Sequence, residues 1–199
     1  MVALYAASGV FHGVPLTRAE HPDAFRLLQR LDQSAILVLI AGTNTPLMVT
    51  LLGGAWRRRC LAGMWGLALV GVGCLWLAPN PPHEAIVGVC LGMGWLGMLP
   101  LAHYYRALGW RPMNWVWAGL LLYTVAAACE LAEWPSGWGA PVRFGFHEVF
   151  HLLSAAASVT FFLFVVRYVL PYPGLEGEEG TVAGGRSPGA GLVPQAMGV

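Results

Sequence analysis

The sequence predicts an all-α membrane protein, and three observations support this prediction. Of its 199 residues, 57% are hydrophobic and 11% are charged, with a mean hydropathy of +0.61, whereas soluble domains carry about 25% charged residues. Five apolar stretches reach the roughly 20 residues that a helix needs to cross a bilayer core of about 30 Å. Polar or Gly/Pro-rich connections separate them, with tryptophans beside these connections, as is typical of the headgroup region.

The five apolar stretches are predicted to be spanning helices, because lipid offers no partner to exposed backbone groups. The predicted spans are Gln33–Leu52, Cys60–Ala78, Glu84–His103, Asn114–Leu131 and His147–Leu170. The predicted connections are residues 53–59, 79–83, 106–112 and 133–143.

Both ends of the sequence differ from this pattern. The apolar segment Met1–His12 predicts a helix of about 18 Å, too short to cross alone, and we interpret it as the second half of a truncated helix. The segment Pro22–Arg30 alternates apolar and basic residues and predicts a short helix lying in the membrane interface. The Gly/Pro-rich segment 171–199 predicts a disordered tail. The predicted organisation is therefore a transmembrane domain at residues 1–170 followed by this tail.

The charge balance favours lipids as partners and argues against nucleic acid. Eleven arginines oppose ten acidic residues, which gives a net charge of +1, and the sequence contains no lysine. A nucleic-acid-binding protein of this length usually shows a basic excess or cluster. We therefore expect membrane lipids, and no nucleic acid, among the partners.

Two histidines at the start of the last predicted span are candidate metal ligands. Ionisable residues inside spans are costly and mark candidate sites. His147 and His151 are four residues apart, so their imidazoles share one helix face and reach one ion. The alternative is a histidine pair that forms hydrogen bonds at a helix entrance. A catalytic zinc site typically needs a third protein ligand, with one position left for water.

Three further residues complete the candidate set. His12 follows Ser8 by four residues, on one face of the truncated helix, although a lone histidine there is also explained as a core residue. Asp32 stands at the head of the first full span, where it is also explained as a helix N-cap. Four predicted crossings separate Asp32 from His147, and an even number returns the chain to the same membrane face. The truncated helix ends at His12 and the next span begins at Asp32, so the sequence predicts that His12, Asp32, His147 and His151 lie at one membrane face.

With these residues assembled, the sequence resembles the bacterial haemolysin III proteins, within the progestin and adipoQ receptor (PAQR) family. The likeness is carried by LYAASGVFH (Leu4–His12), RLDQSAILVLIAGTNTPL (Arg30–Leu47) and HEVFHLLSAAAS (His147–Ser158). The family shows a serine and a histidine four apart, an aspartate in an RLDxSAI context followed by an AGTxTP turn, and a terminal HxxxH. All three features stand here in the same order.

The resemblance implies a seven-helix bundle in which three histidines bind zinc. Transferred to this sequence, it makes His12, His147 and His151 the ligands, with Asp32 and Ser8 acting beside the metal-bound water. The family's first helix has no counterpart here, so the implied fold is that bundle with five full spans and a truncated N-terminal helix. The family is also similar to alkaline ceramidases, which implies hydrolysis of lipid amides or esters and a role in membrane homeostasis.

The orientation in the membrane stays open at this point. The resemblance implies a bacterial inner (plasma) membrane protein with its zinc end in the cytoplasm. On that face the sequence places four arginines, which are Arg18, Arg26, Arg30 and Arg143. The opposite face carries six, which are Arg57, Arg58, Arg59, Arg106, Arg111 and Arg167. The positive-inside rule therefore favours the reverse orientation.

Three interpretations of function remain. The first is a zinc-dependent lipid hydrolase, in which Asp32 accepts a proton and Ser8 stabilises the developing oxyanion. The second is a sensor or binding protein that zinc braces without turnover, with Asp32 as a fourth ligand. The third reads HEVFH as a metalloprotease motif with Glu148 as the base, although Glu148 is also explained as an acid favourable in a first helical turn.

Overall fold

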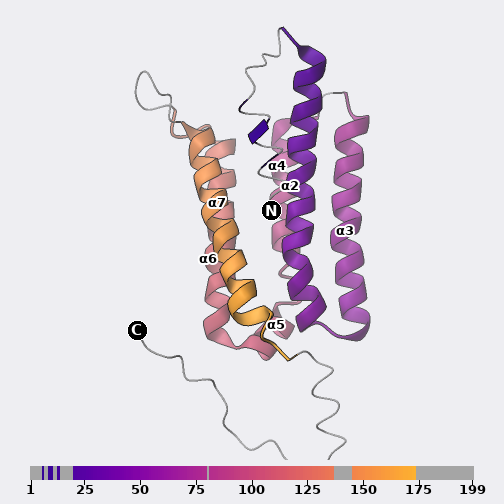
Figure 1. Ribbon diagram of the computed structural model, residues 1–199, viewed down its shortest axis with the longest axis vertical. Helices are drawn as coiled ribbons and strands as arrows, with labels where there is room; N and C mark the ends of the chain where they lie inside the picture. The colour runs from indigo at the N-terminus through magenta and orange to yellow at the C-terminus, as the bar shows by residue number, and fades with distance from the viewer. Residues whose placement is uncertain are drawn as a thin grey trace, which may run out of the picture.

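The computed structural model is a bundle of helices, and it describes residues 6, 9–10, 13, 20–79, 81–136 and 145–173. These described parts contain no strand. The helices are α2 (Pro22–Leu51), α3 (Gly54–Leu77), α4 (His83–Leu96), α5 (Leu101–Leu108), α6 (Trp110–Leu131) and α7 (Phe146–Phe164), which continues into the π-helix η1 (Val165–Val169) (Figure 1). The predictions of a truncated helix at Met1–His12 and of a disordered tail fall largely outside the described residues.

The all-α membrane fold is confirmed. In the described part of the chain, four helices are long and apolar enough to cross a membrane, namely Pro22–Leu51, Gly54–Leu77, Trp110–Leu131 and Phe146–Val169. The pair α4 and α5 would make a fifth span. Large apolar side chains face outward on several helices, such as Leu69, Leu99 and Leu121, each more than 60% exposed. Such an exterior suits lipid, whereas water would disfavour it.

Helix α2 corrects the prediction of a separate interfacial helix at Pro22–Arg30. Proline at the first helical position starts α2, and no glycine or proline interrupts the chain before Gly42. The interfacial segment and the first span are therefore one helix of 30 residues. Asp32 lies inside this helix, so its explanation as an N-cap is wrong. At about 1.5 Å per residue α2 is roughly 45 Å long, and its first turns extend beyond the neighbouring helices (Figure 1).

The AGTNTP segment is helical and does not form the expected turn. Pro46 lies inside α2, where it removes one backbone donor. The polar side chains before it bond back to the preceding turn: Thr43 Oγ1 and Asn44 Nδ2 donate to the Ile40 carbonyl at 3.0 and 2.9 Å, and Thr45 Oγ1 donates to the Ala41 carbonyl at 2.8 Å. These side chains thus bond to their own helix and do not compete with it by forming a turn, and α2 continues through Pro46 to Leu51.

The predicted span Glu84–His103 is broken. Helices α4 and α5 meet at an angle of 47°, and the intervening turn uses three-residue hydrogen bonds, such as Met98 N–H to the Trp95 carbonyl at 2.9 Å. Pro100 explains the break, because it has no backbone donor and its ring disfavours helix in the residue before it. Gly97 lies in the same turn, where a Cβ atom would overlap the Asn44 side chain of α2.

The remaining spans match the prediction, with longer helices and shorter connections. Helix α3 begins at Gly54 and includes the three arginines predicted to lie in a turn, and α6 begins at Trp110 directly after Gly109. Gly54 and Gly109 have φ angles of 53° and 77°, a region that glycine adopts at little steric cost. Arginine is a good helix former, so the polarity of these segments did not mark the ends of the helices.

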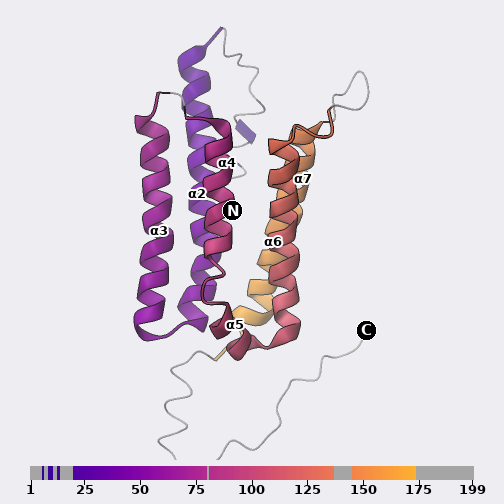
Figure 2. The same cartoon turned by 180° about the vertical axis from the view of Figure 1, so that it is seen from behind.

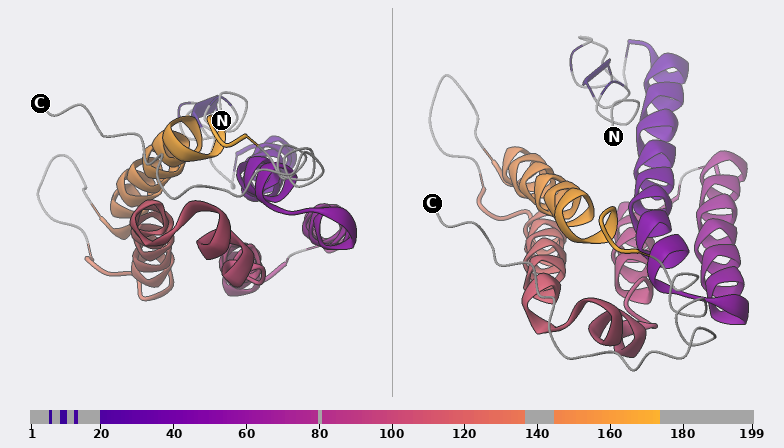
Figure 3. Two further views of the ribbon diagram at one scale, coloured as in Figure 1. Left: turned by 90° about the horizontal axis from the view of Figure 1, so that it is seen from below. Right: turned by 60° about the horizontal axis from the view of Figure 1, so that its bottom comes forward.

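The bundle has two tightly packed pairs, and α4 lies between them. The most extensive contacts join α6 to α7 and α2 to α3, while α4 contacts α2, α3 and α6 (Figure 2). Helices α2, α4 and α7 all begin at one end, and α5 crosses the opposite end (Figures 1 and 3). Buried core residues gather toward the α5 end; among them are Leu47, Met48, Leu51, Tyr104, Met113, Val116, Phe164 and Val169. Among the described residues, fewer large apolar side chains are buried at the end at which α7 begins.

Candidate functional site

The two predicted histidine ligands meet on the first turns of α7. The Nε2 atoms of His147 and His151 are 3.1 Å apart, and their rings stand nearly perpendicular at 83° with centroids 4.6 Å apart. The four-residue spacing on one helix brings them together, as expected from the sequence. Two imidazole nitrogens therefore converge on one point at the end of the bundle where α2 and α4 also begin.

Glu148, the acid of the HEVFH string, turns toward the start of its own helix. Its Oε2 accepts a hydrogen bond from the Gly145 N–H at 2.8 Å, completing a capping box. The side chain is exposed, whereas the two histidines are partly buried. This position fits the explanation of Glu148 as a first-turn acid. The metalloprotease interpretation requires a base directed at the metal, and the cap uses the carboxylate elsewhere.

A buried carboxylate that sequence reasoning missed faces the histidine pair. Glu130, near the end of α6, is only 7% exposed. Both of its oxygens lie 3.4 Å from His147 Nδ1, and its Oε1 lies 3.2 Å from His83 Nε2 at the start of α4. The sequence did carry a signal for this residue. Glu130 is an acid inside a predicted span, where burying an ionisable group costs free energy and therefore marks a candidate site.

Asp32 lines the same cavity as these residues. The cavity has a volume of about 230 Å³ and is bounded by α2, α4, α6 and α7. Its polar side chains include Asp32, His83, Tyr123, Glu130, His147, His151, Ser154 and Ser158. Much of the remaining wall is apolar, with Leu39, Ile86 and Phe150 as examples. The structure thus places three of the five predicted site residues, Asp32, His147 and His151, around one space.

One face of α7 supplies a row of polar groups to this cavity. His147, His151, Ser154 and Ser158 follow one another at helical spacing, and all line the cavity. The Ser158 hydroxyl pairs with the Tyr123 hydroxyl of α6 at 2.8 Å. The Ser154 hydroxyl is buried without a hydrogen-bond partner among the described residues, which leaves it able to bond a polar group inside the cavity. Sequence reasoning missed Tyr123, Ser154 and Ser158 because serine and tyrosine in spans are common.

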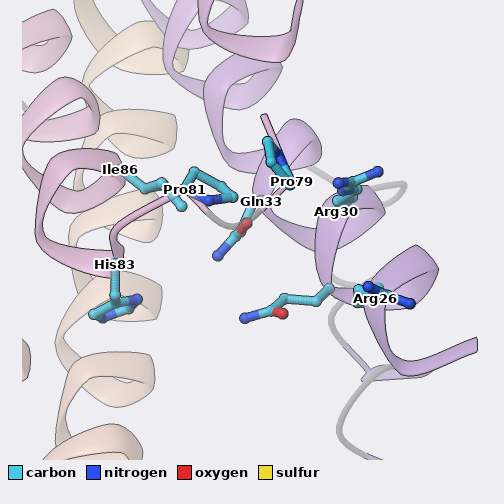
Figure 4. A pocket seen from close by; sticks show the side chains of 8 residues that line it. Arg26, Arg30, Gln33, Pro79, Pro81, His83 and Ile86 are labelled. Atoms are coloured by element: carbon cyan, nitrogen blue, oxygen red, sulfur yellow. The ribbon is translucent and has the colours of Figure 1, made fainter. Parts of the chain in front are cut away.

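A second hollow adjoins the first through His83. It has a volume of about 270 Å³ and lies between α2 and the loop before α4. Figure 4 shows His83 on one side of it, with Arg26 and Arg30 of α2 on the other side and directed away from the histidine. Arg30 donates to the Ala78 carbonyl at 2.9 Å, and Arg26 pairs with Asp23 at 2.7 Å. Both arginines therefore have protein partners, and His83 borders both spaces.

Comparison with known proteins identifies the family. The sequence profile of the family described as haemolysin-III related matches residues 1–162. The chain belongs to the haemolysin III family. This haemolysin III protein is 32% identical to hemolysin-3 of Bacillus cereus over 171 residues, which cover 86% of this chain and 72% of that protein. It is 28% identical to a hemolysin-3 homolog of Bacillus subtilis (strain 168) over 174 residues, covering 87% and 75%.

Family membership confirms the resemblance to haemolysin III and PAQR proteins. The matched region, residues 1–162, includes all five predicted site residues of this haemolysin III protein. Ser8 and His12 lie outside the described residues, so the position of the third predicted ligand is not part of the structure. In the part of the chain that is described, no group of three His, Cys, Asp or Glu side chains is arranged to hold a metal ion.

The described donor set nevertheless fits two positions of a zinc site. Nitrogen ligands about 2.0–2.1 Å from a tetrahedral zinc ion lie about 3.3 Å apart, and the two Nε2 atoms are separated by 3.1 Å. Imidazole is a preferred zinc ligand. The same distance also suits a hydrogen bond between the rings, with the proton on either nitrogen. His147 and His151 would hold the ion together with a third ligand.

Proposed function

We propose that this haemolysin III protein binds zinc through His12, His147 and His151 and hydrolyses amide or ester bonds of membrane lipids. The convergence of two histidine Nε2 atoms in a largely apolar cavity of a membrane bundle carries the proposal. An apolar cavity wall favours the binding of hydrocarbon chains. The row of polar side chains on α7 can form hydrogen bonds with the amide or ester group of a lipid. The proposed location is the bacterial inner (plasma) membrane, where such lipids are at hand.

The proposed site residues have distinct tasks in this mechanism. Bound zinc supplies a Lewis acid and a water nucleophile at neutral pH. Asp32 would accept the proton that the attacking water releases and return it to the nitrogen or oxygen of the leaving group as the amide or ester bond breaks. Ser8 donates a hydrogen bond to the carbonyl oxygen as negative charge develops on it. The apolar wall excludes bulk water, which strengthens these polar interactions.

A second candidate function is a zinc-braced sensor or binding protein without turnover. Asp32 lines the same cavity as the two histidines, and as a fourth ligand it would close the site to water. Removal of zinc separates the two candidates. A structural zinc contributes directly to the stability of the fold, so chelation should unfold a protein that zinc braces. If zinc is only catalytic, chelation should remove the activity while the protein stays folded.

The decisive measurement is the metal content of the detergent-purified protein by mass spectrometry. We expect about one zinc per chain in the parent and little in His12→Ala or His151→Ala, because a catalytic site needs all three ligands. His21→Ala is the matched control, since His21 is exposed just before α2 and lies outside the cavity. A parent without metal, or full zinc in His12→Ala, would contradict the proposed site.

A further inference from the structure

Glu130 is a buried acidic residue inside the helix bundle, and its burial must be compensated by other interactions. Burying a carboxylate costs several kcal/mol unless charge-bearing or donating groups compensate it, and the cost is high in a membrane span. Here two imidazole rings from different helices face it, His83 from α4 and His147 from α7. The carboxylate thus joins three helices at the end of the bundle that holds the cavity.

The hydrogen-bonding capacity of the carboxylate determines where the His147 proton lies. An ionised carboxylate only accepts hydrogen bonds, and a neutral imidazole carries one proton on either nitrogen. Because His147 Nδ1 faces both oxygens of Glu130 at 3.4 Å, the favoured tautomer has its proton on Nδ1. The lone pair then lies on Nε2, the atom that approaches His151.

We propose that Glu130 is a positioning residue of the metal site, one that fixes the tautomer and the ring orientation of His147. This inference rests on the proposed zinc function, and it assigns a task to a residue outside the ligand set. Carboxylates that accept the second N–H of a ligating histidine are a general feature of metal sites, where they raise the ligand's basicity. His83, 3.2 Å from Oε1, holds the carboxylate from its other side.

Zinc affinity of the purified full chain, measured by competition with a chromophoric chelator, tests the proposal. Glu130→Gln keeps the size of the side chain and one carbonyl oxygen but loses the charge. We expect it to weaken zinc binding about 10- to 100-fold. The matched control is Glu133→Gln, because Glu133 follows α6 directly and is exposed. An affinity of Glu130→Gln within about twofold of the parent would overturn the proposal.

Parent and His151→Ala measurements separate this inference from the function on which it rests. If the parent binds no zinc, the proposed function fails first. If the parent binds zinc, His151→Ala loses it and Glu130→Gln keeps the parent affinity, only the role of Glu130 fails. The melting temperature of each zinc-free variant accompanies the titrations, so that a loss of affinity is counted only for a folded protein.

A spectroscopic readout tests the tautomer directly in the parent protein. In the zinc-free parent with 15N-labelled histidine, we expect the His147 resonances to report a protonated Nδ1 and an unprotonated Nε2. The His147→Gln variant assigns these resonances by their loss. In Glu130→Gln the two tautomers should become mixed. A parent His147 protonated on Nε2 would overturn the proposal, since a merely structural carboxylate makes no demand on that proton.

Discussion

Asp32 owes its place in the cavity to the continuity of α2. A residue at the start of a helix is often an aspartate for reasons of capping alone, but Asp32 stands inside a helix that begins at Pro22. Aspartate is a mediocre helix former in such a position. Its carboxylate borders the space into which His147 and His151 project, which suits a role in proton transfer.

Replacing Asp32 with Asn should separate catalysis from metal binding. We expect hydrolysis of fluorescent ceramide or ester-linked phospholipid in mixed micelles to fall by about 10²- to 10⁴-fold, the usual contribution of a general base, while zinc content stays at the parent level. Asp23→Asn serves as the control, because Asp23 is exposed and pairs with Arg26 on the same helix. Loss of zinc in Asp32→Asn would instead identify Asp32 as a ligand, and unchanged turnover would remove its catalytic role.

The residues around the cavity differ in how far the sequence could reveal them. The pairing of His147 with His151 follows from helical spacing alone, and the parity of crossings predicts that Asp32 shares their face. Glu130 is different, because its proximity to His83 depends on how α4 packs beside α6. The sequence of neither segment predicts the contact between Glu130 and His83. The only sequence signal was that Glu130 is an acidic residue in an apolar segment.

The turn between α4 and α5 approaches α2 closely. Gly97 lies where Asn44 packs against the turn, and a Cβ atom there would overlap the Asn44 side chain. That side chain also donates to the Ile40 carbonyl, one turn earlier in α2. The glycine between α4 and α5 thus leaves room for a polar side chain of α2.

Substitution of Gly97 by Ala should destabilise the bundle, although alanine is the better helix former. Overpacking typically costs about 1–3 kcal/mol, so we expect a lower melting temperature in detergent. Gly92→Ala in the preceding helix α4 is the control, because an added Cβ there meets no described atom within 4 Å; it should be neutral or stabilising by up to about 1 kcal/mol.

A second substitution checks the cause of that effect. Asn44→Ala combined with Gly97→Ala should recover part of the loss, because the overlapping side chain is gone and the two changes are coupled. Strict additivity of the two effects, or equal melting temperatures for Gly97→Ala and Gly92→Ala, would contradict the packing explanation.

Hydropathy located the helices better than it located their ends. The segment Glu84–His103 is apolar along its whole length. Hydropathy therefore predicted one continuous span and did not reveal the break at Pro100. Conversely, Arg57–Arg59 read as a connection because they are polar, whereas they are helical in α3. Burial in lipid decides where residues must be apolar, while proline, glycine and packing decide where a helix stops.

The arginines divide the bundle into two unlike ends. Arg57, Arg58 and Arg59 begin α3, while Arg106 and Arg111 flank the junction of α5 with α6. These positions, with Arg167 in η1, lie at the end opposite the cavity (Figure 1). Cytoplasmic ends of membrane proteins carry the excess of positive residues. The cavity end would then face away from the cytoplasm, contrary to the orientation that the family resemblance implies.

Reporter fusions to the carboxyl terminus of the chain test this orientation, since α7 and η1 run toward the arginine-rich end. We expect a fused green fluorescent protein to be fluorescent in cells and a fused alkaline phosphatase to be inactive, as for a cytoplasmic terminus. Replacing Arg57, Arg58 and Arg59 together with Gln should weaken this preference. Active phosphatase on the unmodified chain would instead support a cytoplasmic cavity.

The core residues gather near α5, whereas the cavity lies at the other end of the bundle. Local opening needs less free energy where fewer apolar contacts must break. Backbone amides in the first turns of α4 and α7 should therefore exchange their hydrogens faster than amides near Met113 or Phe164. If the exchange follows this order, the helices around the cavity would separate while the α5 end stays folded, and the lipid chain of the proposed substrate would have lateral entry without unfolding of the protein.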